Sequence, residues 1–227
     1  MRNLNAVLFF GLVVCLLIGC REKTQPGTTS EKDTVKKNSD TTMRTMKSIV
    51  FFGNSMTAGY GLEPSEAFPA VIQHKIDSLG LPYKVINAGV SGETSSGGDS
   101  RIDWILRQPL DIFVLELGGN DGLRGIPLSE TRKNIQSIID KVKAKYPGAK
   151  IVLAGMQIPP NMGQLYTTEF RTMYPELSKK NGLDLIPFLL EGVGGEATLN
   201  QDDGIHPTAA GQRILAGNVW KVLQGIL

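Results

Sequence analysis

Short, continuously apolar runs alternate with longer amphipathic stretches through most of this chain, and this alternation is the feature that most restricts its fold. Runs of this kind are typical of strands covered by helices on both faces, and strand–helix alternation gives a parallel sheet. The sequence therefore predicts an α/β fold, in which functional residues gather where the parallel strands end. The predicted strands are Ser48–Phe52, Tyr83–Asn87, Asp111–Leu117, Lys150–Met156 and Leu183–Ile186.

The first twenty residues do not belong to this pattern. They contain a single apolar run, too short to span a bilayer comfortably, that ends in Leu17-Ile18-Gly19-Cys20. This ending resembles the lipobox of bacterial lipoproteins, in which the cysteine becomes the lipid-modified amino terminus. We therefore expect residues 1–20 to be a lipoprotein signal peptide, with lipidation at Cys20 and a membrane as the partner of the anchor. A plain signal peptide with a chance cysteine and an uncleaved anchor are the alternatives.

The next segment, residues 21–47, is rich in Thr, Lys, Ser and Asp and has hardly any large apolar residue. Such a segment buries too little surface to offset its ordering entropy, which predicts a disordered polar tether before one domain from 48 to 227. Cys15 and Cys20 are the only cysteines, so a chain processed at Cys20 has no thiol nucleophile and no cysteine-ligated metal site. The net charge of +2 is too small to indicate nucleic acid as a partner.

Ser55 follows the first predicted strand, in the string Gly53-Asn54-Ser55-Met56-Thr57. Glycines around it allow a sharp turn that leaves the hydroxyl accessible. A turn or helix-cap serine is the more common interpretation of such a residue when it stands alone. The string is not the Gly-x-Ser-x-Gly elbow of α/β-hydrolases, because position 57 is threonine, and no phosphate-binding Gly-Lys-Ser/Thr follows it.

Two further strings follow the second and third predicted strands. Gly92 could offer a bare backbone N–H to an anion, and Asn120 is a neutral side-chain donor beside glycines. Each taken alone is also compatible with an ordinary glycine-rich turn.

The chain has two histidines, and only one of them suits catalysis. His74 lies in an amphipathic stretch, where we expect a solvent-facing helix residue, so His206 is the one candidate for a base near neutral pH. Asp203, three residues earlier, can turn back to the other ring nitrogen and fix its tautomer. A metal site of the Asp-x-x-His type would need further ligands, and no second histidine or cysteine is nearby. We therefore predict that Ser55 attacks, His206 takes its proton and Asp203 orients His206, while N–H groups of Ser55, Gly92 and Asn120 form an oxyanion hole.

These strings resemble the four blocks of the SGNH hydrolase superfamily, and more closely its branch of multifunctional periplasmic acyl-CoA thioesterases, arylesterases and lysophospholipases. The resemblance runs from about Ile49 to the end of the chain. Further matching segments are Gly118–Gly125, Met156–Ile158, Tyr174-Pro175, Pro187-Phe188 and Gln201–Pro207. It implies a three-layer, flavodoxin-like α/β/α sandwich with a five-stranded parallel sheet, and an acyl-enzyme mechanism without metal or cofactor. One departure is Asn54, since the family usually has aspartate before the serine.

The loop after the fourth predicted strand gives an expectation about the substrate. Ile158, Pro159 and Met162 form an apolar, adaptable surface, and a loop at this place contacts the acyl chain in the branch that the sequence resembles. We therefore expect a serine esterase or thioesterase for acyl esters, monomeric and located in the bacterial cell envelope. The alternatives are a carbohydrate O-acetyl esterase of the same superfamily and an envelope binding lipoprotein whose site has decayed.

Overall fold

The computed structural model describes residues 45–227. The predicted signal peptide, the lipidation site Cys20 and nearly all of the predicted tether lie outside the described residues. The first strand begins at Lys47, which is the last residue of the predicted tether. Lys47 is part of the sheet because its N–H donates to the Pro82 carbonyl at 2.8 Å, which aligns it with Tyr83.

The fold contains one five-stranded sheet, in which all strands run parallel in the order β2-β1-β3-β4-β5. The five predicted strands and the predicted fold class are confirmed, with strand ends that differ by one or two residues. The strands are β1 Lys47–Gly53, β2 Tyr83–Gly89, β3 Ile112–Glu116, β4 Lys150–Ala154 and β5 Asp184–Ile186.

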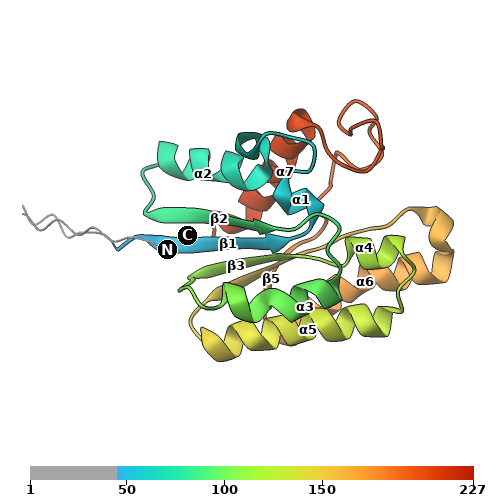
Figure 1. Cartoon of the computed structure of the whole chain (residues 1–227), viewed down its shortest axis with the longest axis horizontal. Coiled ribbons are helices and arrows are strands. Elements are labelled where there is room, and N and C mark those ends of the chain that lie inside the picture. The colour runs from blue at the N-terminus through green and yellow to red at the C-terminus, as the bar shows by residue number, and fades with distance from the viewer. Residues whose placement is uncertain (1–44) are drawn as a thin grey trace, which may run out of the picture. The chain divides into compact units, whose positions relative to one another are not determined.

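Helices cover both faces of this sheet and complete the three layers (Figure 1). One layer contains α1 Ser55–Ala58, α2 Phe68–Ser78 and α7 Ala209–Leu223. The opposite layer contains α3 Ser95–Ile105, α4 Gly119–Leu123, α5 Leu128–Lys145 and α6 Gln164–Asn181. Two short 3-10 helices, η1 Pro64–Glu66 and η2 Pro160–Met162, lie in the connections. Within residues 45–227, no helix combines the length and the apolar character needed to cross a bilayer.

The core shows why the predicted strands are continuously apolar. Successive residues of a strand point to opposite faces, and both faces of β1 are covered. Phe51 packs edge-on against Phe68 of α2, with ring centroids 5.4 Å apart, whereas Phe52 packs against Phe113 and beneath Gly98 of α3. Both phenylalanines of β1 are fully buried, so this strand is fixed from both layers. Its carboxyl end therefore has a well-defined position, close to α1 and α4 (Figure 1).

Candidate active site

Ser55 is the first residue of α1, immediately beyond the carboxyl end of β1. Asn54 caps this short helix, because its Oδ1 accepts the Met56 N–H at 3.0 Å. Gly53 has to be glycine, since a Cβ there would collide with Thr57 and with the Glu116 carboxylate. The local sequence thus turns the chain sharply and leaves Ser55 only 6% exposed.

The structure brings Ser55, His206 and Asp203 into one hydrogen-bonded row. Ser55 Oγ lies 2.9 Å from His206 Nε2, although 151 positions separate the two residues. On the other side of the ring, His206 Nδ1 lies 2.6 Å from Asp203 Oδ2. A carboxylate at Nδ1 favours the tautomer with its proton on Nδ1, which leaves Nε2 as the acceptor for the serine hydroxyl. The arrangement can therefore draw the proton from Ser55 as its oxygen attacks.

Asp203 has the protonation state that this role requires. Its Oδ1 accepts the backbone N–H groups of Ile205 and His206 at 2.8 and 2.9 Å. The His206 N–H, the imidazole and the Ile205 N–H together lower the pKa of Asp203 from 3.8 to about 2. Because the pKa is lowered in the folded protein, the interaction is complete above pH 3.8 and is lost only as the pH falls through about 2. Asp203 therefore carries its charge across the whole neutral range.

Contacts from Gln201 and Tyr60 hold the His206 loop, and Gln212 ties the helix after this loop to the Ser55 side. Gln201 Nε2 donates to the carbonyls of Tyr60 at 2.7 Å and of Pro207 at 3.1 Å, and the Tyr60 ring lies 4.5 Å from the His206 ring between centroids. Gln212 of α7 is buried and bridges Phe68 and Met56, accepting from the N–H of the first and donating to the carbonyl of the second. These contacts were not predicted, because a glutamine in a sequence gives no sign of which distant carbonyl it will meet.

The three predicted oxyanion donors lie at the ends of neighbouring strands. Within residues 45–227, the N–H groups of Ser55 and Gly92 have no hydrogen-bond acceptor. Asn120 Nδ2 uses one N–H for the Glu93 carbonyl at 2.9 Å and has a second one to offer. All three residues can therefore donate to a developing oxyanion without breaking an existing bond.

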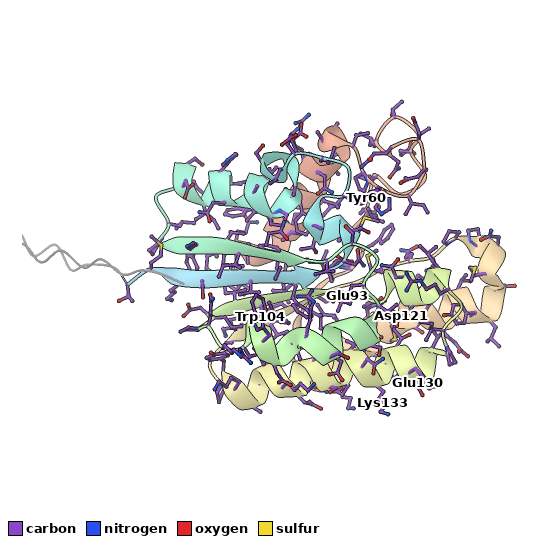
Figure 2. All side chains as sticks on the ribbon, in the orientation of Figure 1. Tyr60, Glu93, Trp104, Asp121, Glu130 and Lys133 are labelled. Atoms are coloured by element: carbon purple, nitrogen blue, oxygen red, sulfur yellow. The ribbon has the colours of Figure 1, made fainter. Side chains whose placement is uncertain are left out.

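An ion pair that was not predicted stabilises the loop that carries Gly92. Arg101 of α3 contacts both carboxylate oxygens of Glu93, and its Nη2 also donates to the Ala88 carbonyl at 2.8 Å. The guanidinium lies 3.9 Å from the Phe52 ring centroid, so it is fixed by the core as well. Glu93 and Tyr60 both lie at the edge where the strands end (Figure 2). An acidic and a basic residue eight positions apart, one in a loop and one in a helix, show no periodicity that would reveal their pairing.

The predicted substrate residues lie on the connection between β4 and α6. Ile158 packs over Gly122 of α4, and the Met162 methyl approaches Gly125, while Pro159 is exposed. The connection therefore covers the short helix that carries Asn120. Its contact with an acyl chain stays a prediction. His74 is exposed on α2, as predicted.

An α/β/α sandwich with a serine, histidine and aspartate in one hydrogen-bonded row defines the class of α/β serine hydrolases. The model of the GDSL-like lipase/acylhydrolase family matches residues 51–214, and the chain belongs to this family. The resemblance seen in the sequence is thereby confirmed.

Relatives of known name cover the same part of the chain. Esterase TesA of Pseudomonas aeruginosa is 40% identical over 182 residues, which are 80% of this chain and 90% of the relative. Thioesterase 1/protease 1/lysophospholipase L1 of Escherichia coli is 37% identical, over 79% of this chain and 84% of the relative. The crystal structure of TesA superimposes with a TM-score of 0.76, covering 80% of this chain and all of that one. AlinE4, an SGNH-hydrolase family esterase of 38% identity, superimposes with a TM-score of 0.67 over 82% of this chain and 99% of its own.

Replacing Gly92 by alanine tests its place in the oxyanion hole. Gly92 has φ of 80° and no atom within 4 Å of an added Cβ, so Gly92→Ala adds backbone strain without a steric clash. The loop should relax toward negative φ and turn its N–H away, lowering kcat for an ester by roughly ten- to a hundredfold. Gly80→Ala is the matched control, because Gly80 has φ of 62°, equally open surroundings and a place after α2 at the opposite edge. Equal kcat in the two variants would exclude Gly92 from the hole.

Proposed function

We propose that this protein is a serine esterase or thioesterase that hydrolyses acyl esters through a covalent acyl-enzyme. The 2.9 Å contact between Ser55 Oγ and His206 Nε2 carries the proposal. Nucleophile and base within hydrogen-bond distance, with the base oriented by a third group, are the features that activate a serine.

In the first half of the reaction, Ser55 Oγ attacks the acyl carbonyl while its proton passes to His206 Nε2. Asp203 stabilises the imidazolium that forms. The carbonyl oxygen becomes an oxyanion and accepts hydrogen bonds from the Ser55 and Gly92 N–H groups and the Asn120 amide. When the tetrahedral intermediate collapses, the bond to the leaving group breaks and His206 returns its proton to that alcohol or thiol.

In the second half, a water molecule replaces the leaving group. His206 takes a proton from this water, the hydroxide attacks the acyl carbon, and the same donors stabilise the second oxyanion. Collapse then breaks the bond to Ser55 Oγ, which recovers its proton from His206, and the carboxylic acid is released. The residues return to their starting protonation states, so the cycle is complete.

The relatives favour acyl esters as the substrate class. Their names include esterase, thioesterase, lysophospholipase and arylesterase, the last from Vibrio mimicus at 33% identity. The apolar connection with Ile158 and Met162, packed against the helix of Asn120, could accept an acyl chain beside the reacting carbonyl. We therefore favour a medium- or long-chain acyl ester over an acetylated carbohydrate. A decayed binding protein is disfavoured because the catalytic row is complete.

We also propose that the domain is a monomer tethered to the bacterial cell envelope by lipid at Cys20. The lipobox-like Leu17-Ile18-Gly19-Cys20 and the polar stretch after it support this placement. Residues 21–46, if flexible, would allow the domain to move within about 30 Å of the anchor.

Labelling and substitution should identify the nucleophile and the base. A fluorophosphonate probe should label the wild type and not Ser55→Ala, because only an activated serine reacts with it. His206→Ala should lower kcat at least about a thousandfold without a comparable change in the unfolding midpoint. His74→Ala removes the other, exposed histidine and should leave kcat unchanged. A near-normal rate in His206→Ala would remove His206 from the mechanism.

A series of p-nitrophenyl esters should separate the two hydrolase functions. If the acyl-chain proposal holds, kcat/KM for octanoate exceeds kcat/KM for acetate. The double variant Ile158→Ala/Met162→Ala should then lower kcat/KM for octanoate by roughly tenfold more than kcat/KM for acetate. Leu79→Ala, a change of an exposed residue after α2, is the control. A strong preference for acetate in the wild type would favour the O-acetyl esterase instead.

The mass of the processed protein tests the anchor. Expressed in a bacterium that processes lipoproteins, the mature chain should begin at Cys20, carry added acyl mass and sediment with membranes. Cys20→Ala should abolish the acyl mass and release the protein, whereas Cys15→Ala should not. A mature chain that begins elsewhere and carries no lipid would contradict the proposal.

A further inference from the structure

Glu116 is a buried acid, next to the active site, that the proposed reaction does not use. It is the last residue of β3 and is only 1% exposed. Its Oε2 accepts the Asn54 N–H at 3.0 Å and the Thr57 hydroxyl at 2.8 Å, and its Oε1 accepts from Asn54 Nδ2 at 2.8 Å. All three donors belong to the short segment that contains the nucleophile. Burying a carboxylate costs free energy, and the hydrogen bonds that offset this cost all come from one short segment.

The orientation of the Asn54 amide follows from its neighbours. The Met56 N–H needs an acceptor and finds Asn54 Oδ1 at 3.0 Å, so the amide nitrogen faces Glu116. The same Oδ1 lies 3.4 Å from Ser55 Oγ. One amide therefore links the buried carboxylate to the nucleophile.

We propose that Glu116 is a positioning residue that fixes Ser55 through Asn54, and that the amide at position 54 is what lets a carboxylate occupy this place. The inference rests on the proposed function, since it assigns a role in the reaction of Ser55. An aspartate at position 54 would face Glu116 directly, because the Asn54 side chain already contacts this carboxylate.

The charges around Glu116 show what that aspartate would do. Burial raises the pKa of Glu116 to about 7, against the lowering by the bonds from Asn54 and Thr57. The other titratable groups at this end of the sheet, apart from His206 beyond Ser55, bond elsewhere. Tyr174 of α6 donates to the Leu117 carbonyl, Asp121 of α4 accepts from Ser95, and Arg101 of α3 bonds to Glu93. Among the described residues, no cation bonds to this pair to compensate a second carboxylate, so one of the two acids would have to bind a proton.

The Asn54 amide also affects which acceptor the Ser55 hydroxyl donates to. A carboxylate at position 54 would be a stronger acceptor than an amide oxygen and would compete with His206 for the Ser55 hydroxyl. With asparagine, the 2.9 Å bond to His206 Nε2 is favoured over the 3.4 Å approach to Oδ1. Glu116 keeps the amide in this orientation, because Nδ2 has an ionic acceptor only on that side.

An exchange of the two functional groups tests the contact. Glu116→Gln alone places two amide nitrogens opposite each other or leaves one donor unsatisfied. Asn54→Asp alone places two carboxylates in contact. The double variant Asn54→Asp/Glu116→Gln restores one amide and one carboxylate with the same number of protons. The amide oxygen at position 116 would then accept from the residue 54 N–H and from Thr57, while the amide nitrogen would donate to the carboxylate at position 54.

We expect kcat for p-nitrophenyl octanoate to fall about tenfold in Glu116→Gln, with KM unchanged, because the nucleophile is misplaced while the binding surface is intact. In Asn54→Asp, activity should fall increasingly as the pH rises, because the second carboxylate must then ionise. The double variant should recover to within about threefold of the wild type and lose this added pH dependence. Asp140→Asn, an exposed acid-to-amide change on α5, is the control for net charge and should keep the wild-type kcat.

Unfolding midpoints of the wild type and of the three variants at positions 54 and 116 distinguish a loss of stability from a loss of activity. If Glu116→Gln lowers the midpoint but not kcat, Glu116 is structural only and the proposal is wrong. The proposal is also wrong if the fold-decrease of kcat in the double variant equals the product of the fold-decreases in the two single variants, since the groups then act independently. An inactive wild type that no fluorophosphonate labels would refute the proposed function instead. Non-additive midpoints would then still show the contact between residues 54 and 116.

Discussion

The position of β1 is the constraint from which the site is built. This strand lies between β2 and β3, and both of its faces are covered, with Phe51 and Phe52 fully buried in opposite layers. Deleting a buried aromatic of this size costs about 3–5 kcal/mol, so the strand end cannot shift without a large loss of stability. A nucleophile placed directly beyond it inherits this rigidity. Gly53, at the strand end, allows Thr57 and Glu116 to approach the backbone more closely than any side chain at this position would permit.

The base reaches the same place by a different route. His206 lies on a long connection before α7, and its loop contacts the Ser55 side through the bond from Gln201 to the Tyr60 carbonyl and through the Tyr60 ring. Gln212, on the buried face of α7, adds bonds to Phe68 and Met56. Within residues 45–227, every buried side-chain nitrogen and oxygen has a hydrogen-bond partner, which means that these bonds leave no unsatisfied group. The site thus joins Ser55, held by a rigid strand end, to His206 on a more exposed, hydrogen-bonded loop.

The sequence predicted the fold and the three residues of the hydrogen-bonded row because both leave local signals. Continuous apolar runs mark strands buried on two faces, and polar residues directly after such runs lie at one edge of a parallel sheet. The supporting residues left no comparable signal. Glu93 with Arg101, and Gln212 with Met56, are paired only by the folded chain, over separations of 8 and 156 positions. Glu116 was different, since a single acid inside the apolar run of residues 112–117 is a local anomaly that could have been read as a buried carboxylate.

The polar groups beneath Ser55 explain why a neutral residue at position 54 suits this site. In this buried place, where no described cation bonds to the pair, burial already disfavours one carboxylate, as the raised pKa of Glu116 shows, and a second carboxylate at position 54 would be disfavoured further. When Glu116 is ionised, the charge lies at the end of a central strand, while the neutral Asn54 lies next to Ser55. The oxygen of Ser55 therefore develops its bond to carbon beside a dipole rather than beside a full negative charge. The tetrahedral intermediate is itself an anion. A carboxylate at position 116 repels it less than a carboxylate at position 54 would, so this placement acts in the same direction as the oxyanion donors.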